Sequence, residues 1–281
     1  ERLFNASQLL RKIHRFLQLY KQLKDTAELS KQAEIIHELD ALIIDKDLMK
    51  IDILIDERAA AINTKQRLLH IANRDLASGI QEGNEAAIAK SLEIYRNLDM
   101  LKTFLDNQIE SYVTDIRQRI KQCFNGADMA TLQKTSIKSE ISSRKLPGKV
   151  PMLTTSMNYK SKLLNAIEWL FTDELLTYCE QAIAINRCLK RISTENFLQK
   201  FSRAICELLK VSFEESPVHV LQILQQNLPK LLASFNQLKE KVGKDIELQK
   251  DIFSSLNSGY IEKCAANLKI SSAIEHVSED T

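Results

Sequence analysis

Residues 84–123 read NEAAIAKSLEIYRNLDMLKTFLDNQIESYVTDIRQRIKQC, and this stretch decides the fold class. Its apolar residues recur at steps of three or four positions, which places them on one face of an α-helix. They are Ile88, Leu92, Tyr95, Leu98, Leu101, Leu105, Ile109, Tyr112, Ile116, Ile120 and Cys123. Asn84 is a residue type that caps helices, because its side-chain oxygen accepts a hydrogen bond from a free backbone N–H. At 1.5 Å per residue, one helix over this stretch would be about 60 Å long. We therefore expect it in an elongated bundle.

Glycine and proline are scarce along the whole chain, with 6 and 4 residues among 281. Average proteins contain about 7% glycine and 5% proline. Strands joined by tight turns consume both residues, because such turns need positive φ or a fixed φ. Since 44% of the residues are nevertheless hydrophobic, long amphipathic helices account for the composition. The sequence predicts an all-α protein, an elongated rod of stacked antiparallel helical bundles.

A stretch without helical periodicity separates two helical regions. Residues 126–158 are rich in Ser, Thr and Lys and include LPGKVP at 146–151. We expect an N-terminal helical bundle over 1–125, a flexible connector over 126–158 and a second helical bundle over 159–281. In the second bundle, a heptad pattern contains Pro229, which lacks an N–H and is expected to kink its helix.

The first helix carries apolar residues at steps of four, three, four and three, the spacing of a coiled-coil seam. They are Leu9, Ile13, Phe16, Tyr20 and Leu23. Two interpretations stay open: packing within the chain, or contact with a helix of a partner protein. We expect Leu9, Ile13, Phe16 and Tyr20 to bind a partner.

No catalytic or metal-binding constellation accompanies these helices. The histidines are scattered without Cys, Asp or Glu at a metal-ligand spacing, and no phosphate-binding or nucleophile motif is present. The acidic residues of 34–47 could suggest a carboxylate site, but solvent-facing helix surfaces often carry such runs. We expect no enzyme activity, no metal and no cofactor.

The charge pattern limits the classes of partner. The 39 basic and 37 acidic residues are interspersed and give a formal charge of +2, whereas nucleic-acid surfaces concentrate basic residues on one face. Acidic residues also interrupt the polar faces, so direct membrane insertion is not expected. Five cysteines without a CxxC pair indicate free thiols in a reducing compartment.

Three stretches in this order resemble subunit five of the conserved oligomeric Golgi complex. The first, ELSKQAEIIHELDAL at 28–42, is similar to the family's ELxKxAQxLxELDxL block. The second, AKSLEIYRNLDMLK at 89–102, is similar to LQVFYNLxxLK. The third, LPKLLASFNQL at 228–238, is similar to YPKLLRLYNDL, and Pro147-Gly148-Lys149 resembles a family landmark. The chain begins at Glu1 rather than Met, and we expect it to be the N-terminal part of a longer subunit.

The resemblance implies a non-enzymatic scaffold on the cytosolic face of the Golgi. Such complexes tether vesicles that recycle glycosylation enzymes, and they work with SNAREs and Rab GTPases. The family's subunit five pairs with subunit seven, which is therefore the expected partner. The alternatives are a membrane-remodelling or other coiled-coil adaptor domain and, third, an enzyme.

Overall fold

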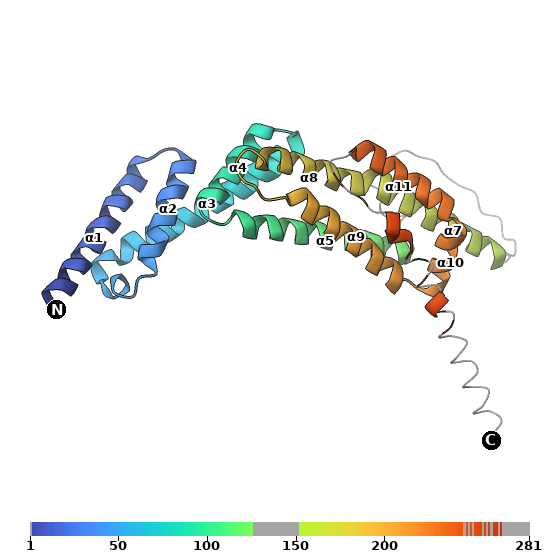
Figure 1. Cartoon of the computed structure of the whole chain (residues 1–281), viewed down its shortest axis with the longest axis horizontal. Coiled ribbons are helices and arrows are strands. Elements are labelled where there is room, and N and C mark those ends of the chain that lie inside the picture. Colours follow the sequence, from blue (N-terminus) through green and yellow to red (C-terminus); the bar gives the residue numbers. More distant parts are fainter. Residues whose placement is uncertain are drawn as a thin grey trace, which may run out of the picture. The chain divides into compact units, whose positions relative to one another are not determined.

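The computed structural model describes residues 2–125 and 152–243, together with residues 246, 248, 250–254, 256, 258, 261–263 and 265. In this part of the chain it contains ten α-helices and no strand, which confirms the all-α prediction (Figure 1). The first five helices are α1 (Arg2–Asp25), α2 (Leu29–Ile43), α3 (Ile55–Glu82), α4 (Glu85–Asn97) and α5 (Leu101–Asn125). The other five are α7 (Met152–Trp169), α8 (Leu175–Leu189), α9 (Phe197–Glu215), α10 (Val218–Gln226) and α11 (Leu228–Val242). Short 3₁₀ and π elements complete the fold: η1 (Leu48–Lys50), η2 (Asp52–Leu54), η4 (Leu170–Glu174) and η5 (Lys250–Phe253).

The chain forms two compact units, and both are discontinuous in sequence. Unit 1 comprises Glu1–Gln108 and Ile183–Asn196, and unit 2 comprises Ile109–Ala182 and Phe197–Thr281. Of the predicted connector 126–158, residues 126–151 lie outside the described part of the chain, and α7 begins at Met152.

Unit 1 is built from helix pairs that follow one another along the chain. Helix α1 packs against α2, and α3 packs against α4 (Figure 1). The buried side of α2 holds Ala33, Ile36 and Leu39, and the α3–α4 pair buries Leu68, Ala72 and Ile88 among others. The apolar stripes of these helices therefore form the core of the unit.

The turn between α3 and α4 contains only Gly83 and Asn84. Gly83 has a φ of 68°, a left-handed conformation that costs glycine nothing and other residues energy. The Asn84 N–H donates to the Gly79 carbonyl at 2.7 Å and thereby closes α3. The Asn84 side chain accepts a hydrogen bond from the Ala87 N–H at 3.2 Å and thereby caps α4. The predicted N-cap is confirmed, and it serves both helices.

The single helix expected over 84–123 is wrong, because the chain turns at residues 98–100. Asp99 has a φ of 55° and is the one non-glycine residue with a positive φ among the described residues. The Asp99 N–H donates to the Arg96 carbonyl at 3.0 Å, and the Met100 N–H donates to the Tyr95 carbonyl at 2.9 Å. This pair of bonds is a Schellman motif, which ends α4 and lets α5 leave in a new direction.

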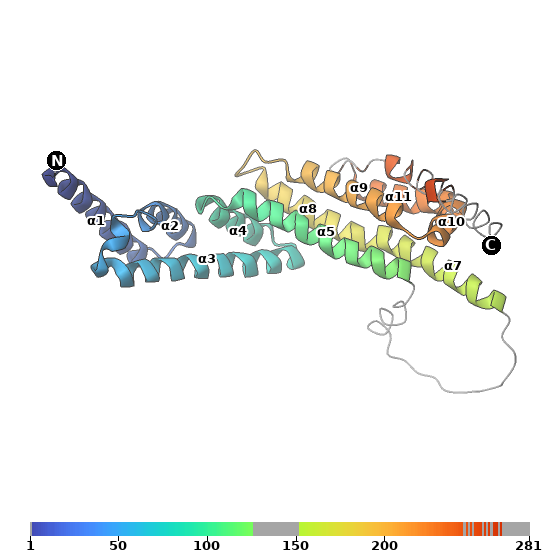
Figure 2. The same cartoon turned by 90° about the horizontal axis from the view of Figure 1, so that it is seen from below.

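Unit 2 contains a run of helix that pairs with the C-terminal part of α5. Helix α7, the π-turn η4 and α8 follow one another without a loop, and α5 lies beside them (Figure 2). Tyr112 of α5 meets the Tyr178 ring at a centroid distance of 5.2 Å. Near the other end, the Tyr159 hydroxyl donates to the Phe124 carbonyl at 2.8 Å. These contacts make the two segments antiparallel.

The core of unit 2 contains a cluster of phenylalanines. Phe171, Phe213 and Phe235 surround Phe253 at ring-centroid distances of 6.3, 6.0 and 5.3 Å. The Phe171–Phe235 and Phe235–Phe253 pairs meet nearly edge to face, at 74° and 82°, an arrangement that aromatic rings favour.

Pro229 interrupts its helical pattern, but as a break rather than the predicted kink. Helix α10 ends at Gln226, and α11 begins at Leu228 with Pro229 in its first turn. In that position the missing N–H of proline would have no helical partner anyway. The Asn227 side chain donates to the Ile223 carbonyl at 2.7 Å and satisfies one of the acceptors at the end of α10.

Candidate functional site

Helix α1 has a buried face that packs within unit 1. Phe16, Leu19 and Leu23 are 0%, 2% and 5% exposed, and α1 contacts α2 and η1. We call these three residues the inner seam. The Phe16 and Tyr20 rings stack with centroids 6.4 Å apart. Burial of this seam stabilises the helix pair through the hydrophobic effect.

The four residues predicted to bind a partner occupy two kinds of environment. Phe16 is fully buried in the inner seam, so in this structure it packs within the chain. Leu9, Ile13 and Tyr20 are half-buried. The structure therefore brings Phe16 and Tyr20 together but leaves only three of the four accessible to another molecule.

The sequence prediction overlooked a second apolar stripe on α1. Leu3, Phe4, Leu10 and Leu17 are 88%, 65%, 65% and 43% exposed. Leu3, Leu10 and Leu17 are separated by seven positions, and two helical turns are about 7.2 residues, so they share one face. The seven-residue spacing was the signal that could have revealed this stripe.

Ion pairs attach α1 to the end of α2 and the loop that follows. The Lys12 ammonium lies 2.7 Å from an Asp45 carboxylate oxygen and 3.7 Å from Asp47, and Arg15 pairs with Glu38. The hydrogen bond between Lys12 and Asp45 raises the pKa of the Lys12 ammonium and lowers that of the Asp45 carboxyl. Asp45 also accepts the Asp47 N–H at 2.9 Å.

The acidic residues over 34–47 therefore form ion pairs and hydrogen bonds with side chains of neighbouring helices. Asp40 pairs with Lys65 of α3 at 2.5 Å, and Glu34 accepts a hydrogen bond from Asn97 at 3.3 Å. In the described part of the chain, no group of three or more His, Cys, Asp or Glu residues is placed to hold a metal ion.

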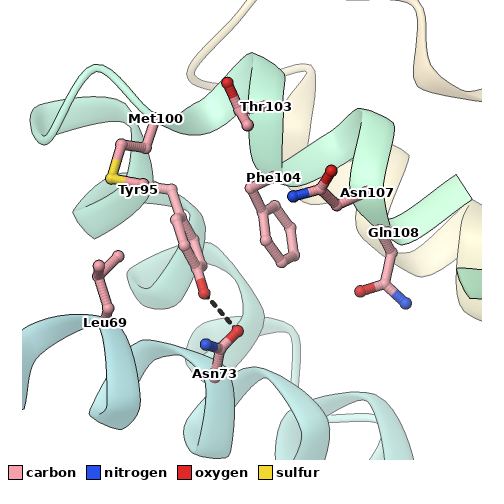
Figure 3. Close-up of a pocket in the computed structure, with 8 residues that line it drawn as sticks. All are labelled: Leu69, Asn73, Tyr95, Met100, Thr103, Phe104, Asn107 and Gln108. Carbon is pink, nitrogen blue, oxygen red and sulfur yellow. Dashed lines mark hydrogen bonds between the residues drawn. The ribbon is translucent and has the colours of Figure 1, made fainter. Parts of the chain in front are cut away.

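A pocket of about 300 Å³ lies where α3, α4 and α5 meet in unit 1 (Figure 3). Its lining includes the stacked pair Tyr95 and Phe104, whose ring centroids are 4.1 Å apart. The Tyr95 hydroxyl donates to the Asn73 side-chain oxygen, and burial raises the pKa of Tyr95 to about 12. The remaining lining residues are Leu69, Met100, Thr103, Asn107 and Gln108.

All eight lining residues are uncharged, and this limits what the pocket can bind. A phosphate or carboxylate would find amides, a hydroxyl and rings there, but no cation. The pocket could hold a neutral group that offers both an apolar surface and hydrogen bonds. Residues from three helices converge only through the Asp99 turn, so no sequence pattern predicted this site.

Burial makes three of the described thiols poor nucleophiles. Burial raises the pKa of Cys123 to about 11 and that of Cys179 to about 12, and it also raises the pKa of Cys188. Since the thiolate is the reactive form, these cysteines are unsuited to catalysis. Cys264 lies outside the described residues.

The segment 183–196 joins unit 1 through the start of α4. The Arg187 guanidinium lies 2.7 Å from a Glu85 carboxylate oxygen, and Arg191 lies 3.8 Å from the other. The Cys188 thiol also contacts the Glu85 backbone carbonyl at 3.5 Å. Arg187 contributes most to lowering the pKa of Glu85. These contacts are structural, because they hold the first turn of α4 against the end of α8 and the residues after it.

The described helices define an all-α protein, and helix α1 exposes a stripe of apolar side chains. Among the residues that the structure describes, none of the helices combines the length and apolar character needed to span a bilayer. The profile of "Conserved oligomeric Golgi complex subunit 5, C-terminal" matches residues 48–239. The chain therefore belongs to the family of conserved oligomeric Golgi complex subunit 5.

Relatives from three organisms carry the same description. Conserved oligomeric Golgi complex subunit 5 of Drosophila melanogaster is 36% identical over 279 residues, which are 95% of this chain and 37% of that protein. The Mus musculus relative is 24% identical over 306 positions, which cover 100% of this chain and 35% of that protein. The Dictyostelium discoideum relative is 30% identical over 148 residues, 50% of this chain and 16% of that protein. The chain thus spans about a third of its animal relatives. A comparison with solved structures found no significant match.

The comparisons correct one expectation about the position of the chain in its subunit. The matching profile is the C-terminal one of the family, so the expected N-terminal part is not supported. The second and third sequence blocks lie within the matched range, and the first, at 28–42, precedes it. The second block contains Tyr95 and the Asp99 turn, and the third begins at the break before Pro229.

Proposed function

We propose that this chain is part of a non-enzymatic scaffold subunit of a Golgi vesicle-tethering complex. In this role it acts in intra-Golgi retrograde transport, which maintains the glycosylation enzymes, at the cytosolic face of the Golgi membrane. The observation that carries the proposal is the family match over 48–239, together with 36% identity to the fly subunit along nearly the whole chain. The all-α fold agrees with a scaffold role.

The partners in this proposal are the other subunits of the complex, and subunit seven is the expected direct partner. SNAREs and Rab GTPases are further partners that the role implies. The predicted contact through Leu9, Ile13, Phe16 and Tyr20 stays a prediction for this pairing. The half-buried positions of Leu9, Ile13 and Tyr20 support it, whereas Phe16 is fully buried in this structure.

Replacement of the endogenous subunit by a tagged full-length copy tests the proposal. We expect the tagged protein to co-purify with the other subunits of the complex and to localise to the Golgi. Its depletion should cause incomplete Golgi glycans on cell-surface proteins, and re-expression should restore them. Normal glycans after complete depletion, or purification without any other subunit, would overturn the proposed function.

A further inference from the structure

The exposed stripe on α1 follows the spacing of a coiled-coil interface. Residues at alternating steps of three and four positions along this face are Leu3, Ala6, Leu10, Ile13, Leu17 and Tyr20. We call them the outer seam. Leu3, Ala6, Leu10 and Leu17 are exposed, and Ile13 and Tyr20 are half-buried. Such a stripe, two residues wide, is the surface onto which a second helix packs its own side chains.

The outer seam is separate from the surface that α1 uses within unit 1. The inner seam already packs within the unit, and the ion pairs of Lys12 and Arg15 fix α1 to α2 and its loop. Leu3, Leu10 and Leu17 remain on the solvent side of this fixed helix. A partner can therefore bind without opening the α1–α2 pair.

The charge of α1 indicates what kind of helix fits. No Asp or Glu occurs between Arg2 and Lys24, which corrects the expectation that acidic residues interrupt every polar face. Lys21 flanks the outer seam, and Lys24 occupies its next position, with its ammonium 4.4 Å from the centroid of the Tyr20 ring. Neither lysine forms an ion pair with the residues that the structure describes. Carboxylates at the flanking positions of a partner helix would complement them.

The same charges argue against two other occupants. Two copies of α1 packed seam to seam would bring two basic segments together, without any carboxylate between Arg2 and Lys24 to compensate. An anionic membrane would attract the basic side chains of α1, but Lys12 and Arg15 are already paired with Asp45 and Glu38, which weakens this attraction. A helix that presents acidic residues only along its flanks avoids both conflicts.

We propose that the outer seam of α1 binds an amphipathic helix of another subunit of the complex. This helix has aliphatic residues at 3.5-residue spacing and Asp or Glu at the flanking positions. The inference rests on the proposed function, because it takes the partner from the tethering complex.

The experiment uses full-length protein co-expressed pairwise with each other subunit of the complex and measures retained partner in a pull-down. Leu10→Asp with Leu17→Asp should weaken binding of one subunit by at least about 100-fold, since burial of each leucine contributes at least about tenfold. The matched control, Gln8→Asp with Gln22→Asp, adds the same charge on exposed positions of α1 away from the seam and should bind like wild type.

A charge variant keeps the test valid if the leucine variant fails to fold. Lys21→Glu should weaken the same pairing severalfold, whereas Arg11→Glu, an equal change on the far side of α1, should not. Circular dichroism of each variant reports its helix content.

Four other results would refute the proposed helix partner, and each would refute it for a different reason. Wild-type binding by both seam variants would refute the outer seam as the interface. If the wild-type protein floats with phosphatidylserine-containing vesicles, and the leucine variant no longer floats but still binds the other subunit, the seam would be a membrane-binding surface. Dimers in light scattering that dissociate on Leu10→Asp would assign it to a second copy. If the wild-type protein binds no other subunit, the proposed function fails, and this inference fails with it.

Discussion

Replacement of Phe16 and of its neighbour Leu17 by alanine should have opposite consequences, because the two side chains lie on different faces of α1. Phe16 is fully buried, and Leu17 is 43% exposed. Removal of a buried phenylalanine side chain costs about 3–5 kcal/mol, because transfer free energy is lost and a cavity remains. Truncation of an exposed side chain typically changes stability by less than about 0.5 kcal/mol.

The assay is urea unfolding of the whole chain followed by far-ultraviolet circular dichroism. We expect Phe16→Ala to reduce the free energy of unfolding of unit 1 by about 3 kcal/mol or more, and Leu17→Ala to leave it nearly unchanged. In the pairwise pull-down we expect the opposite ranking. Leu17→Ala should weaken partner binding because Leu17 belongs to the outer seam, whereas Phe16→Ala, where it remains folded, should weaken it less. A loss below about 1 kcal/mol for Phe16→Ala, or equal losses for both variants, would refute the assignment of two separate faces.

Three further predictions concern the turns and the pocket of unit 1. Asn84→Ala should destabilise the unit by about 1 kcal/mol, because α4 loses its side-chain cap, and Asn84→Asp should restore most of it in the same urea assay. Asp99→Val should destabilise by about 1–2 kcal/mol, since a β-branched residue at positive φ is strained, whereas Asp99→Gly should not; equal melting temperatures for the two variants would contradict the left-handed turn. For Tyr95, the raised pKa of about 12 means that folding favours the neutral phenol. Its contribution to stability is complete below pH 10, the ordinary pKa, and is lost as the pH rises toward about 12. Tyr95→Phe should reduce this loss in alkaline titrations of stability.

The sequence predicted the helices better than the places where they end. The step from Leu98 to Leu101 is three positions, which is also a normal step within one helix. The pattern therefore continues unchanged through the Asp99 turn, and only backbone geometry distinguishes the two cases. A glycine at position 99 would have signalled the turn. Asp tolerates the same conformation but is common elsewhere.

Pro229 shows a related limit. Its effect on the helix was foreseen from its missing N–H, but proline is compatible both with a kink inside a helix and with the first turn of a new one. Asn227, whose side chain closes α10, selects the second arrangement. This contact joins residues only four positions apart, but the presence of an asparagine at position 227 is not enough to predict it.

The candidate surfaces were harder to predict, for two physical reasons. On α1, two apolar stripes share one helix, so a single heptad count through Leu9 and Phe16 selected a set that includes buried and half-buried residues. The pocket depends on Tyr95 and Phe104, which come together because the chain reverses between them. Composition and periodicity are properties of one helix at a time. They therefore cannot predict a pocket whose lining residues come from three helices.

The interleaving of the two units has a consequence for how the protein is made. Unit 1 includes Ile183–Asn196, so a ribosome must synthesise residues 109–182 of unit 2 before unit 1 can be completed. Until then, the first turn of α4 lacks the Arg187 and Arg191 partners of Glu85. A nascent chain that ends near residue 125 would therefore display an incomplete unit 1 to chaperones and proteases. Translation speed over residues 109–196 thus sets how long that vulnerable period lasts.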